Sequence, residues 1–191
     1  LRAVSHDELG HLRDATADYE DAVRLGKKDE KLYHRFAELM YQRFKFDKAE
    51  AAYTVLIKDY KSRNWEHFYN RGICNLRLRD YREAEDDFSK AIVYNKKSAD
   101  AFLQRGIANF RLGNEGSAFR DFRRSIELRP DYFRPFEQRG LIYFEQERFE
   151  LAMNDFNRSI ELKPTGDALY CRGYIRYIQG DKTGGCEDLK A

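Results

Sequence analysis

The dipeptide Arg-Gly recurs along this chain at a nearly constant spacing. Neighbouring copies lie 34, 34 and 33 residues apart. An alanine followed four residues later by phenylalanine recurs in step with it. A fixed period of this length is typical of repeat proteins, in which each unit packs mainly against its neighbours. We therefore predict an array of repeats rather than one globular domain. The Arg-Gly copies are Arg71-Gly72, Arg105-Gly106, Arg139-Gly140 and Arg172-Gly173.

One unit of the array, residues 133–164, has the pattern of two amphipathic helices joined by a short turn. Aromatic residues recur three or four positions apart in each half, and small residues such as Gly140 and Ala152 interrupt the aromatic faces. Such spacing predicts helices with one apolar face, and Pro164 ends the second helix. The predicted fold class is all-α: an α-solenoid of antiparallel helix hairpins.

The same frame gives the expected helices and repeats. First helices are expected at about 29–43, 64–77, 99–112, 132–145 and 166–178. Second helices are expected at about 11–25, 46–60, 81–94, 114–128, 149–162 and 182–190. Asp131 is expected to cap the helix that follows it. The predicted repeats are 1–29 (partial, mainly a second helix), 30–64, 65–98, 99–132, 133–165 and 166–191 (second helix truncated). Because the array is cut at both ends and Leu1 is not a methionine, we expect an excised segment.

A period of 34 with glycine in the first helix, Ala-x3-Phe in the second and proline at the end resembles the tetratricopeptide repeat. The resemblance covers the whole chain, although Arg precedes the glycine where the family more often has Leu. It implies that the hairpins stack into a right-handed superhelix. It also implies that the first helices line a concave surface, where partners bind as extended peptides or helices.

Each arginine of an Arg-Gly pair has an aspartate 16 residues later. Where Phe36 replaces the arginine, Ala52 replaces the aspartate, so the two charges disappear together. This pattern predicts a charge-assisted hydrogen bond between the two helices of a hairpin, with a structural role. The predicted pairs are Arg2 with Asp18, Arg71 with Asp87, Arg105 with Asp121, Arg139 with Asp155 and Arg172 with Asp188.

The composition excludes several function classes. The 35 basic and 33 acidic residues nearly cancel, so the chain has no overall field that attracts polyanions. Its three cysteines include no CxxC, which argues against a zinc site or a disulfide framework and favours a reducing compartment, hence a cytoplasmic location. Cys74 is expected in the core. Cys171 and Cys186 are close enough in the last unit for a bridge, but we expect them reduced.

Motifs that carry chemistry are missing from the sequence. It contains no phosphate-binding glycine loop, no His-Glu-x-x-His and no nucleophile elbow, and its four histidines have no second ligand at metal spacing. No apolar run approaches the roughly 20 residues that span a bilayer. We therefore expect no catalytic residue, cofactor or metal, and no membrane span. The chain is not expected to be an enzyme.

The resemblance places the partner surface on inward residues of the first helices. Family members that clamp a chaperone's C-terminal carboxylate use Lys and Asn there, whereas this chain has His34 with Glu38 and Tyr69 with Ile73, so no such clamp is expected. The predicted function is a non-catalytic scaffold that binds a peptide or helix of a partner protein. The candidate residues are Tyr41, Tyr69, Arg77, Leu103, Phe110, Arg111, Arg134, Glu137, Phe144, Tyr170, Tyr174 and Tyr177.

Two alternatives stay open. A nucleic-acid-associated or enzyme-accessory module would use the basic patch of Arg120, Arg123, Arg124, Arg129 and Arg134. Asp121 and Glu127 interleave with that patch and no aromatic stacking platform accompanies it, so a solvated convex face is the preferred interpretation and nucleic acid is not the expected partner. Self-association through the cut ends, whose apolar faces lack their usual cover, is the other alternative.

Overall fold

A computed structural model describes residues 12–27 and 29–190 of the chain, and every regular element in that part is an α-helix. The all-α fold class is thus confirmed. The helices are α2 (Leu12–Arg24), α3 (Glu30–Gln42), α4 (Phe46–Lys58), α5 (Trp65–Leu78), α6 (Tyr81–Tyr94), α7 (Ala99–Arg111), α8 (Glu115–Leu128), α9 (Phe133–Glu145), α10 (Phe149–Leu162), α11 (Gly166–Ile178) and α12 (Lys182–Asp188).

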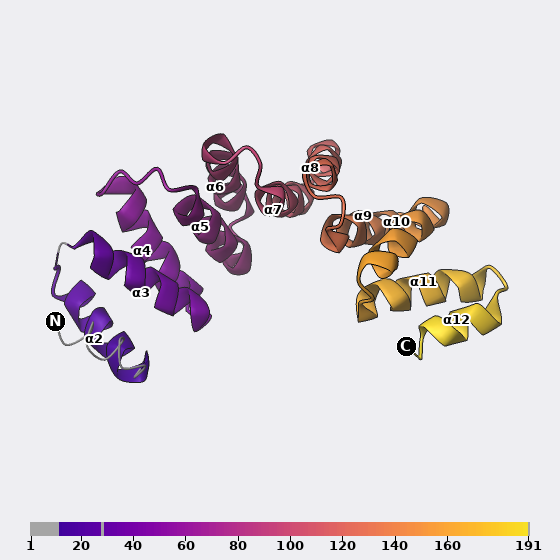
Figure 1. Ribbon diagram of the computed structural model, residues 1–191, viewed down its shortest axis with the longest axis horizontal. Helices are drawn as coiled ribbons and strands as arrows, with labels where there is room; N and C mark the ends of the chain where they lie inside the picture. The colour runs from indigo at the N-terminus through magenta and orange to yellow at the C-terminus, as the bar shows by residue number, and fades with distance from the viewer. Residues whose placement is uncertain (1–11, 28, 191) are drawn as a thin grey trace. The chain divides into compact units, whose positions relative to one another are not determined.

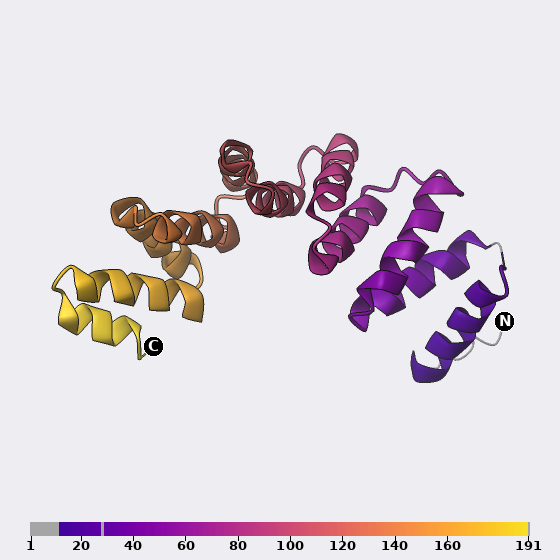
Figure 2. The ribbon, with the colours of Figure 1, turned by 180° about the vertical axis from the view of Figure 1, so that it is seen from behind.

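The helices pair into antiparallel hairpins within two compact units, one ending at Lys96 and the other beginning at Lys97 (Figure 1). The first unit contains the hairpins α3–α4 and α5–α6, with α2 packed against α3. The second contains α7–α8, α9–α10 and α11–α12. The view from behind shows the two helices of each of these hairpins side by side (Figure 2). In the second unit the first helices α7 and α11 both contact the first helix α9, which stacks the three hairpins.

Helix ends lie within two residues of the positions expected from the sequence. Local capping explains several of them: the side chains of Asn64, Ser98 and Thr165 each accept a hydrogen bond from a backbone N–H in the first turn of the following helix. The expectation for Asp131 was wrong. Tyr132 is the N-cap of α9, without a side-chain capping bond, so Asp131 lies one residue too early to serve.

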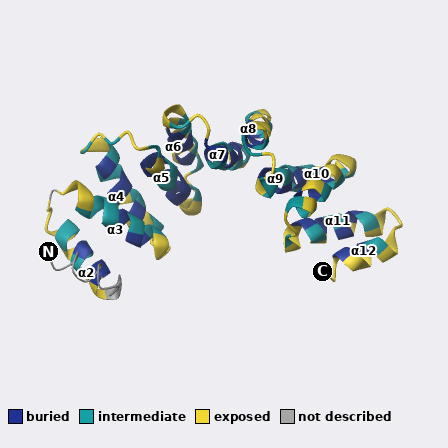
Figure 3. Ribbon diagram, in the orientation of Figure 1, coloured by how far each residue is buried: buried dark blue, intermediate teal, exposed yellow. Residues whose placement is uncertain are grey.

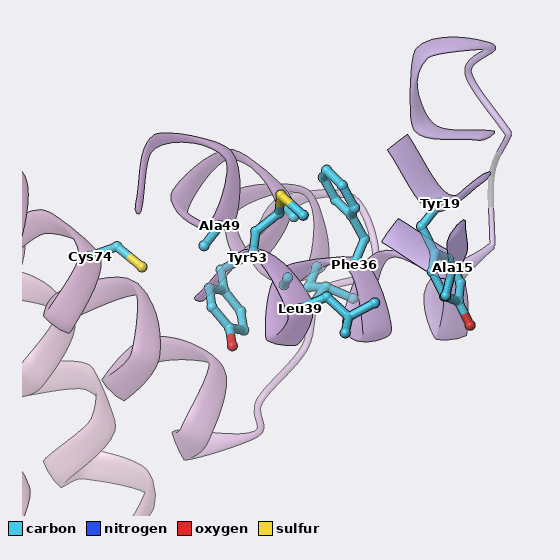
Figure 4. Packing of buried hydrophobic residues seen from close by; sticks show 11 residues of the cluster. Ala15, Tyr19, Phe36, Leu39, Ala49, Tyr53 and Cys74 are labelled. Carbon is cyan, nitrogen blue, oxygen red and sulfur yellow. The ribbon is translucent and has the colours of Figure 1, made fainter. Parts of the chain in front are cut away.

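The core is a stripe of buried residues on one face of each helix (Figure 3). In the first unit, the α4 residues Ala49 and Tyr53 belong to a cluster that also includes Phe36 of α3 and Cys74 of α5 (Figure 4). Tyr53 is 1% exposed and Cys74 is fully buried, as expected for a core cysteine. Because residues of four helices, α2 to α5, share this cluster, it holds successive hairpins together.

The glycine of each Arg-Gly pair allows the two helices of a hairpin to approach closely. A Cβ atom on Gly140 would lie 2.9 Å from Cε1 of the fully buried Phe156. The same contact would be 2.8 Å at Gly72 with Phe88, closer than real Cβ atoms come to a neighbour. The phenylalanine ring therefore fills the space where a side chain would stand, and glycine and phenylalanine recur together.

The turn between the two helices of each hairpin contains one residue in the left-handed conformation. Its φ is +58° at Phe44, +69° at Arg79, +79° at Gly113, +57° at Glu147 and +98° at Gly180. In this conformation the next backbone N–H groups bond back to the carbonyls of the first helix, as in Lys45 N–H to Met40 O at 2.9 Å. Glycine adopts this conformation without strain, and the other three residues do not.

Candidate functional site

The repeated arginine and aspartate form the same two-bond pair in four hairpins. Arginine Nε and Nη2 each donate to one aspartate oxygen, at distances between 2.5 and 2.9 Å. All four aspartates are buried, and the pairs are those of Arg71, Arg105, Arg139 and Arg172. In the hairpin without the pair, Phe36 and Ala52 are both buried. Arg2, the predicted partner of Asp18, lies outside the described residues.

Further side chains bind these buried carboxylates. Asn75 Nδ2 donates to Asp87 Oδ2 at 3.1 Å, and Arg71 Nη1 donates to Thr54 Oγ1 of the preceding hairpin at 2.8 Å. Burial raises the pKa of the Asp87 carboxyl, and the hydrogen bonds from Arg71 oppose that shift. The geometry is that of a structural link across three helices. A comparable link in the last repeat joins Arg172 to Asn157.

Side chains of α7, α8 and α9 form a cavity of about 60 Å³ in the second unit. Apolar side chains, among them Ile107, Phe110 and Leu141, line it together with the charged Arg111 and Glu145. Arg111 and Glu145 are exposed, whereas Phe110 is half-buried. The cavity thus has an apolar floor with one charge of each sign beside it.

A row of tyrosines continues this surface along α11. Tyr170, Tyr174 and Tyr177 are 58%, 43% and 47% exposed, and their spacing of four and three residues places them on one helix face. The Tyr174 ring packs edge-on against Phe144 of α9, with 5.7 Å between ring centroids. Phe144 is half-buried, so it joins the row to the neighbouring helix. We call Phe144, Tyr170, Tyr174 and Tyr177 the aromatic row.

Two residues predicted for the partner surface are buried instead. Leu103 is 1% exposed and packs with Phe122 and Ile142 in the core of the second unit. Glu137 is 8% exposed and accepts a hydrogen bond from the Thr165 hydroxyl, the N-cap of α11. Both side chains are covered by the next repeat, because part of an inward helical stripe also forms the contact between successive hairpins. They are therefore removed from the candidate surface.

The remaining candidates differ in exposure. In the first unit Tyr41 and Tyr69 are half-buried and Arg77 is exposed. Tyr69 contacts Trp65, with 5.9 Å between ring centroids, and so has an aromatic neighbour on its own helix. In the second unit Arg134 is exposed. These residues give each unit some aromatic and charged surface, but the largest exposed aromatic area among the described residues lies on α11.

The arginines of the basic patch are mostly engaged with acidic groups. Arg129 donates to Asp100 at 2.9 Å and lies over the Tyr132 ring, 3.5 Å from its centroid. Arg124 bonds Glu127 at 2.9 Å. Arg123 also lies 3.8 Å from Glu127, so three of the five arginines of the patch lie beside a carboxylate.

One polar cluster was missed in the sequence. His34 Nδ1 of α3 lies 2.9 Å from His67 Nε2 of α5, although the two residues are 33 positions apart. That separation is close to one repeat, which is 35 residues here from Phe36 to Arg71, so the repeat period itself was the signal that places them on neighbouring first helices. Among the described residues no group of three or more His, Cys, Asp or Glu side chains is arranged to hold a metal ion.

Other sequence expectations concern the membrane and the cysteines. In the part of the chain that the structure covers, no helix is long and apolar enough to cross a membrane. Cys171 and Cys186 are free thiols rather than a disulfide, the first buried and the second exposed.

Stacked antiparallel hairpins with a recurrent Gly–Phe contact define an α-helical repeat protein. Family models described as tetratricopeptide repeat match residues 34–93, 75–133 and 134–165. Because these matches cover more than half of the sequence, the chain belongs to the tetratricopeptide repeat family. A search of curated proteins found no match.

Several solved structures share the fold. A tetratricopeptide repeat protein from Parabacteroides merdae is 27% identical, with a TM-score of 0.72 over 98% of this chain and 73% of that one. PilW, a type IV pilus biogenesis factor, is 23% identical, with a TM-score of 0.75 over 97% of this chain and 86% of its own. YrrB, described as having an unusual peptide-binding site, is 23% identical, with a TM-score of 0.64 over 90% and 89%.

Proposed function

We propose that this chain is a non-catalytic scaffold that binds a peptide or helix of a partner protein on the inward faces of its first helices. The observation that carries the proposal is the aromatic row, which continues the apolar floor between α7 and α9. Aromatic side chains at such positions are effective anchors, because they bury a large area and lose little rotamer entropy on binding. Arg111 and Glu145 beside the floor would orient the ligand.

Membership of the tetratricopeptide repeat family supports a binding role. Among the similar structures, YrrB is described as a protein with a peptide-binding site, which is a property of that protein and agrees with this proposal. The buried Arg–Asp pairs, the most chemically suggestive charges of the sequence, are occupied with each other. The charged residues that most suggested catalysis therefore have a structural role, which favours binding over catalysis.

The proposal is tested by affinity capture of partners from the source cell with the intact chain and three variants. Tyr69→Ala truncates the inward surface of the first unit, while Phe110→Ala and Tyr174→Ala truncate that of the second. Loss of a central aromatic anchor costs about 2 kcal/mol, or roughly 30-fold in affinity, so the partner should be strongly depleted from at least the Tyr174→Ala capture.

Arg158→Ala is the matched control, because Arg158 lies on the second helix α10 and forms only an exposed ion pair with Glu161. The control should retain the partner. A partner that all three aromatic variants retain as well as the intact chain does would move the binding site off the inward faces.

Self-association is a second candidate, favoured by the large exposed apolar area of α11, where Ile178 is also 46% exposed. It predicts a concentration-dependent increase in mass by light scattering that Tyr174→Ala reduces. A monomer at all concentrations tested would leave the heterologous partner as the occupant of that face.

A further inference from the structure

Three side chains, Ser62, His67 and His34, form a hydrogen-bonded series between successive repeats of the first unit, and Glu38 lies within ion-pair distance of its end. His34 Nε2 lies 3.3 Å from Glu38 Oε1, and His34 Nδ1 lies 2.9 Å from His67 Nε2. His67 Nδ1 lies 2.9 Å from Ser62 Oγ, which also accepts a hydrogen bond from the Asn64 backbone N–H. The chain therefore runs from α3, through α5, to the segment that precedes α5.

In the neutral state this chain satisfies every polar atom along it with one arrangement of protons. The Ser62 hydroxyl donates to His67 Nδ1, His67 Nε2–H donates to His34 Nδ1, and His34 Nε2–H donates to the Glu38 carboxylate. Each histidine is then in its Nε2–H tautomer. A neutral imidazole has one donor and one acceptor, so no other tautomer gives His34 a donor toward Glu38 while leaving its Nδ1 free to accept.

One extra proton fits the same chain. It binds His34 Nδ1, which then donates to His67 Nε2; the proton of His67 moves to its Nδ1, which donates to Ser62 Oγ. The resulting imidazolium of His34 stays on Glu38. A second proton does not fit, because both histidines would then carry N–H groups on the facing nitrogens, and two like charges would lie 2.9 Å apart at their closest atoms.

The surroundings make the second protonation costly at His67 in particular. His67 is 5% exposed, and its ring packs against Tyr53 of α4, with 6.0 Å between ring centroids. Burial lowers the pKa of His67 and the neighbouring His34 lowers it further, while Glu30 and Glu38 of α3 and Glu66 of α5 act in the opposite direction.

Arg35 offsets part of the negative charge that lies near the two histidines. Arg35 Nη1 donates to Glu38 Oε2 at 3.1 Å, so a cation shares the Glu38 carboxylate with His34. The remaining acids therefore do not offset the burial of His67, whose pKa is lowered overall.

A shared proton explains the contact of the two rings better than a shared metal ion does. The ring centroids lie 5.0 Å apart while the facing nitrogens are 2.9 Å apart, so both nitrogens lie close to the line between the centroids. Two imidazoles that coordinate one metal ion must instead aim both lone pairs at a point beside that line, about 2 Å from each nitrogen.

We propose that His34 and His67 form a pH-sensitive joint between the first helices α3 and α5, closed when the pair carries no proton or one and opened by a second. The direction in which stability changes with pH follows from the difference in proton binding between the folded and unfolded chain. The unfolded chain binds protons near the ordinary histidine value of about 6.5, whereas the buried His67 of the folded chain resists protonation, so stability is full above that pH and falls as the pH decreases below it. Opening of the joint would also alter the inward surface near Tyr41 and Tyr69.

The joint is tested first by NMR of the histidine ring nitrogens in the whole chain. At pH 8 both His34 and His67 should be Nε2–H tautomers. On acidification the pKa of His67 should lie below 6.5. An Nδ1–H tautomer of His67 at pH 8, or a pKa of His67 at or above 6.5, would overturn the proposal.

Urea unfolding at pH 7 and pH 5 is the second measurement, with His67→Gln as the variant. Glutamine retains a hydrogen-bond donor for His34 Nδ1 but does not titrate. The intact chain should lose stability between these pH values, and the variant should lose markedly less. Equal losses in both proteins would assign the pH dependence to other groups. The NMR result on the unmutated chain decides the question if the variant does not fold.

Discussion

Arg139 and Asp155 face each other across the α9–α10 hairpin with two hydrogen bonds of 2.7 Å, Nε to Oδ2 and Nη2 to Oδ1. The aspartate side chain is 7% exposed and the arginine side chain 24% exposed. The hydrogen bonds that Arg139 donates to Asp155 are the main reason that the pKa of Arg139 is raised. The pair is thus a structural contact, and we expect the contributions of Arg139 and Asp155 to the free energy of unfolding to be coupled.

Asp155→Ala should destabilise the chain by about 3 kcal/mol, because it leaves a partly buried guanidinium without its partner. The double change Arg139→Phe with Asp155→Ala should cost clearly less, since the chain itself uses Phe36 with Ala52 at the equivalent places. Urea unfolding of the two variants checks this. Equal midpoints would show that the two residues are not energetically coupled.

Gly140→Ala should destabilise by about 1–3 kcal/mol, because the new Cβ would lie 2.9 Å from the ring of the fully buried Phe156. Gly166→Ala is the matched control: no atom lies within 4 Å of the Cβ that it would add, so a much smaller effect is expected. Thermal unfolding of both variants provides the measurement, and similar melting temperatures would argue against the close contact.

Glu147→Gly should stabilise the chain by about 0.5–1 kcal/mol, because Glu147 has a φ of +57° that costs a side-chain-bearing residue energy and costs glycine little. The reverse change, Gly113→Ala, imposes the same strain where φ is +79° and should destabilise by a similar amount. Chemical denaturation measures both. Stabilisation by Gly113→Ala would contradict the left-handed turn.

Cys186 should react with a thiol reagent at pH 8 much faster than Cys74 or Cys171. Burial raises the pKa of the Cys74 thiol to about 12 and that of Cys171 to about 11, so little reactive thiolate is present at either. Cys186 is exposed. Mass spectrometry of briefly labelled protein locates the adduct. Equally fast labelling of Cys74 would mean that the core of the first unit opens readily.

The raised thiol pKa values also fix the direction of the alkaline pH dependence. Above about pH 9 the unfolded chain loses thiol protons that the folded chain keeps, so the free energy of unfolding should fall as the pH rises further. Replacing Cys74 with serine should reduce this slope, which denaturation between pH 8 and 10 would measure. An unchanged slope would assign the alkaline dependence to other groups.

The sequence by itself determined the hairpins, because a helix, its turn and its apolar face depend on residues close together in the chain. Helix ends, the all-α fold and the recurrence of glycine with phenylalanine all followed from a period that any single unit displays. Even the Arg–Asp pairing could be predicted, since the charges vary together between repeats, and the structure has four such pairs at hydrogen-bond distance.

Only the tertiary structure decided which inward residues stay accessible. Leu103 and Tyr170 occupy equivalent places in their repeats, yet Leu103 is 1% exposed and Tyr170 58% exposed. The difference arises because the following repeat covers one and no described helix covers the other. The contact of His34 with His67 has the same origin, because only the packing of neighbouring repeats brings these two side chains together.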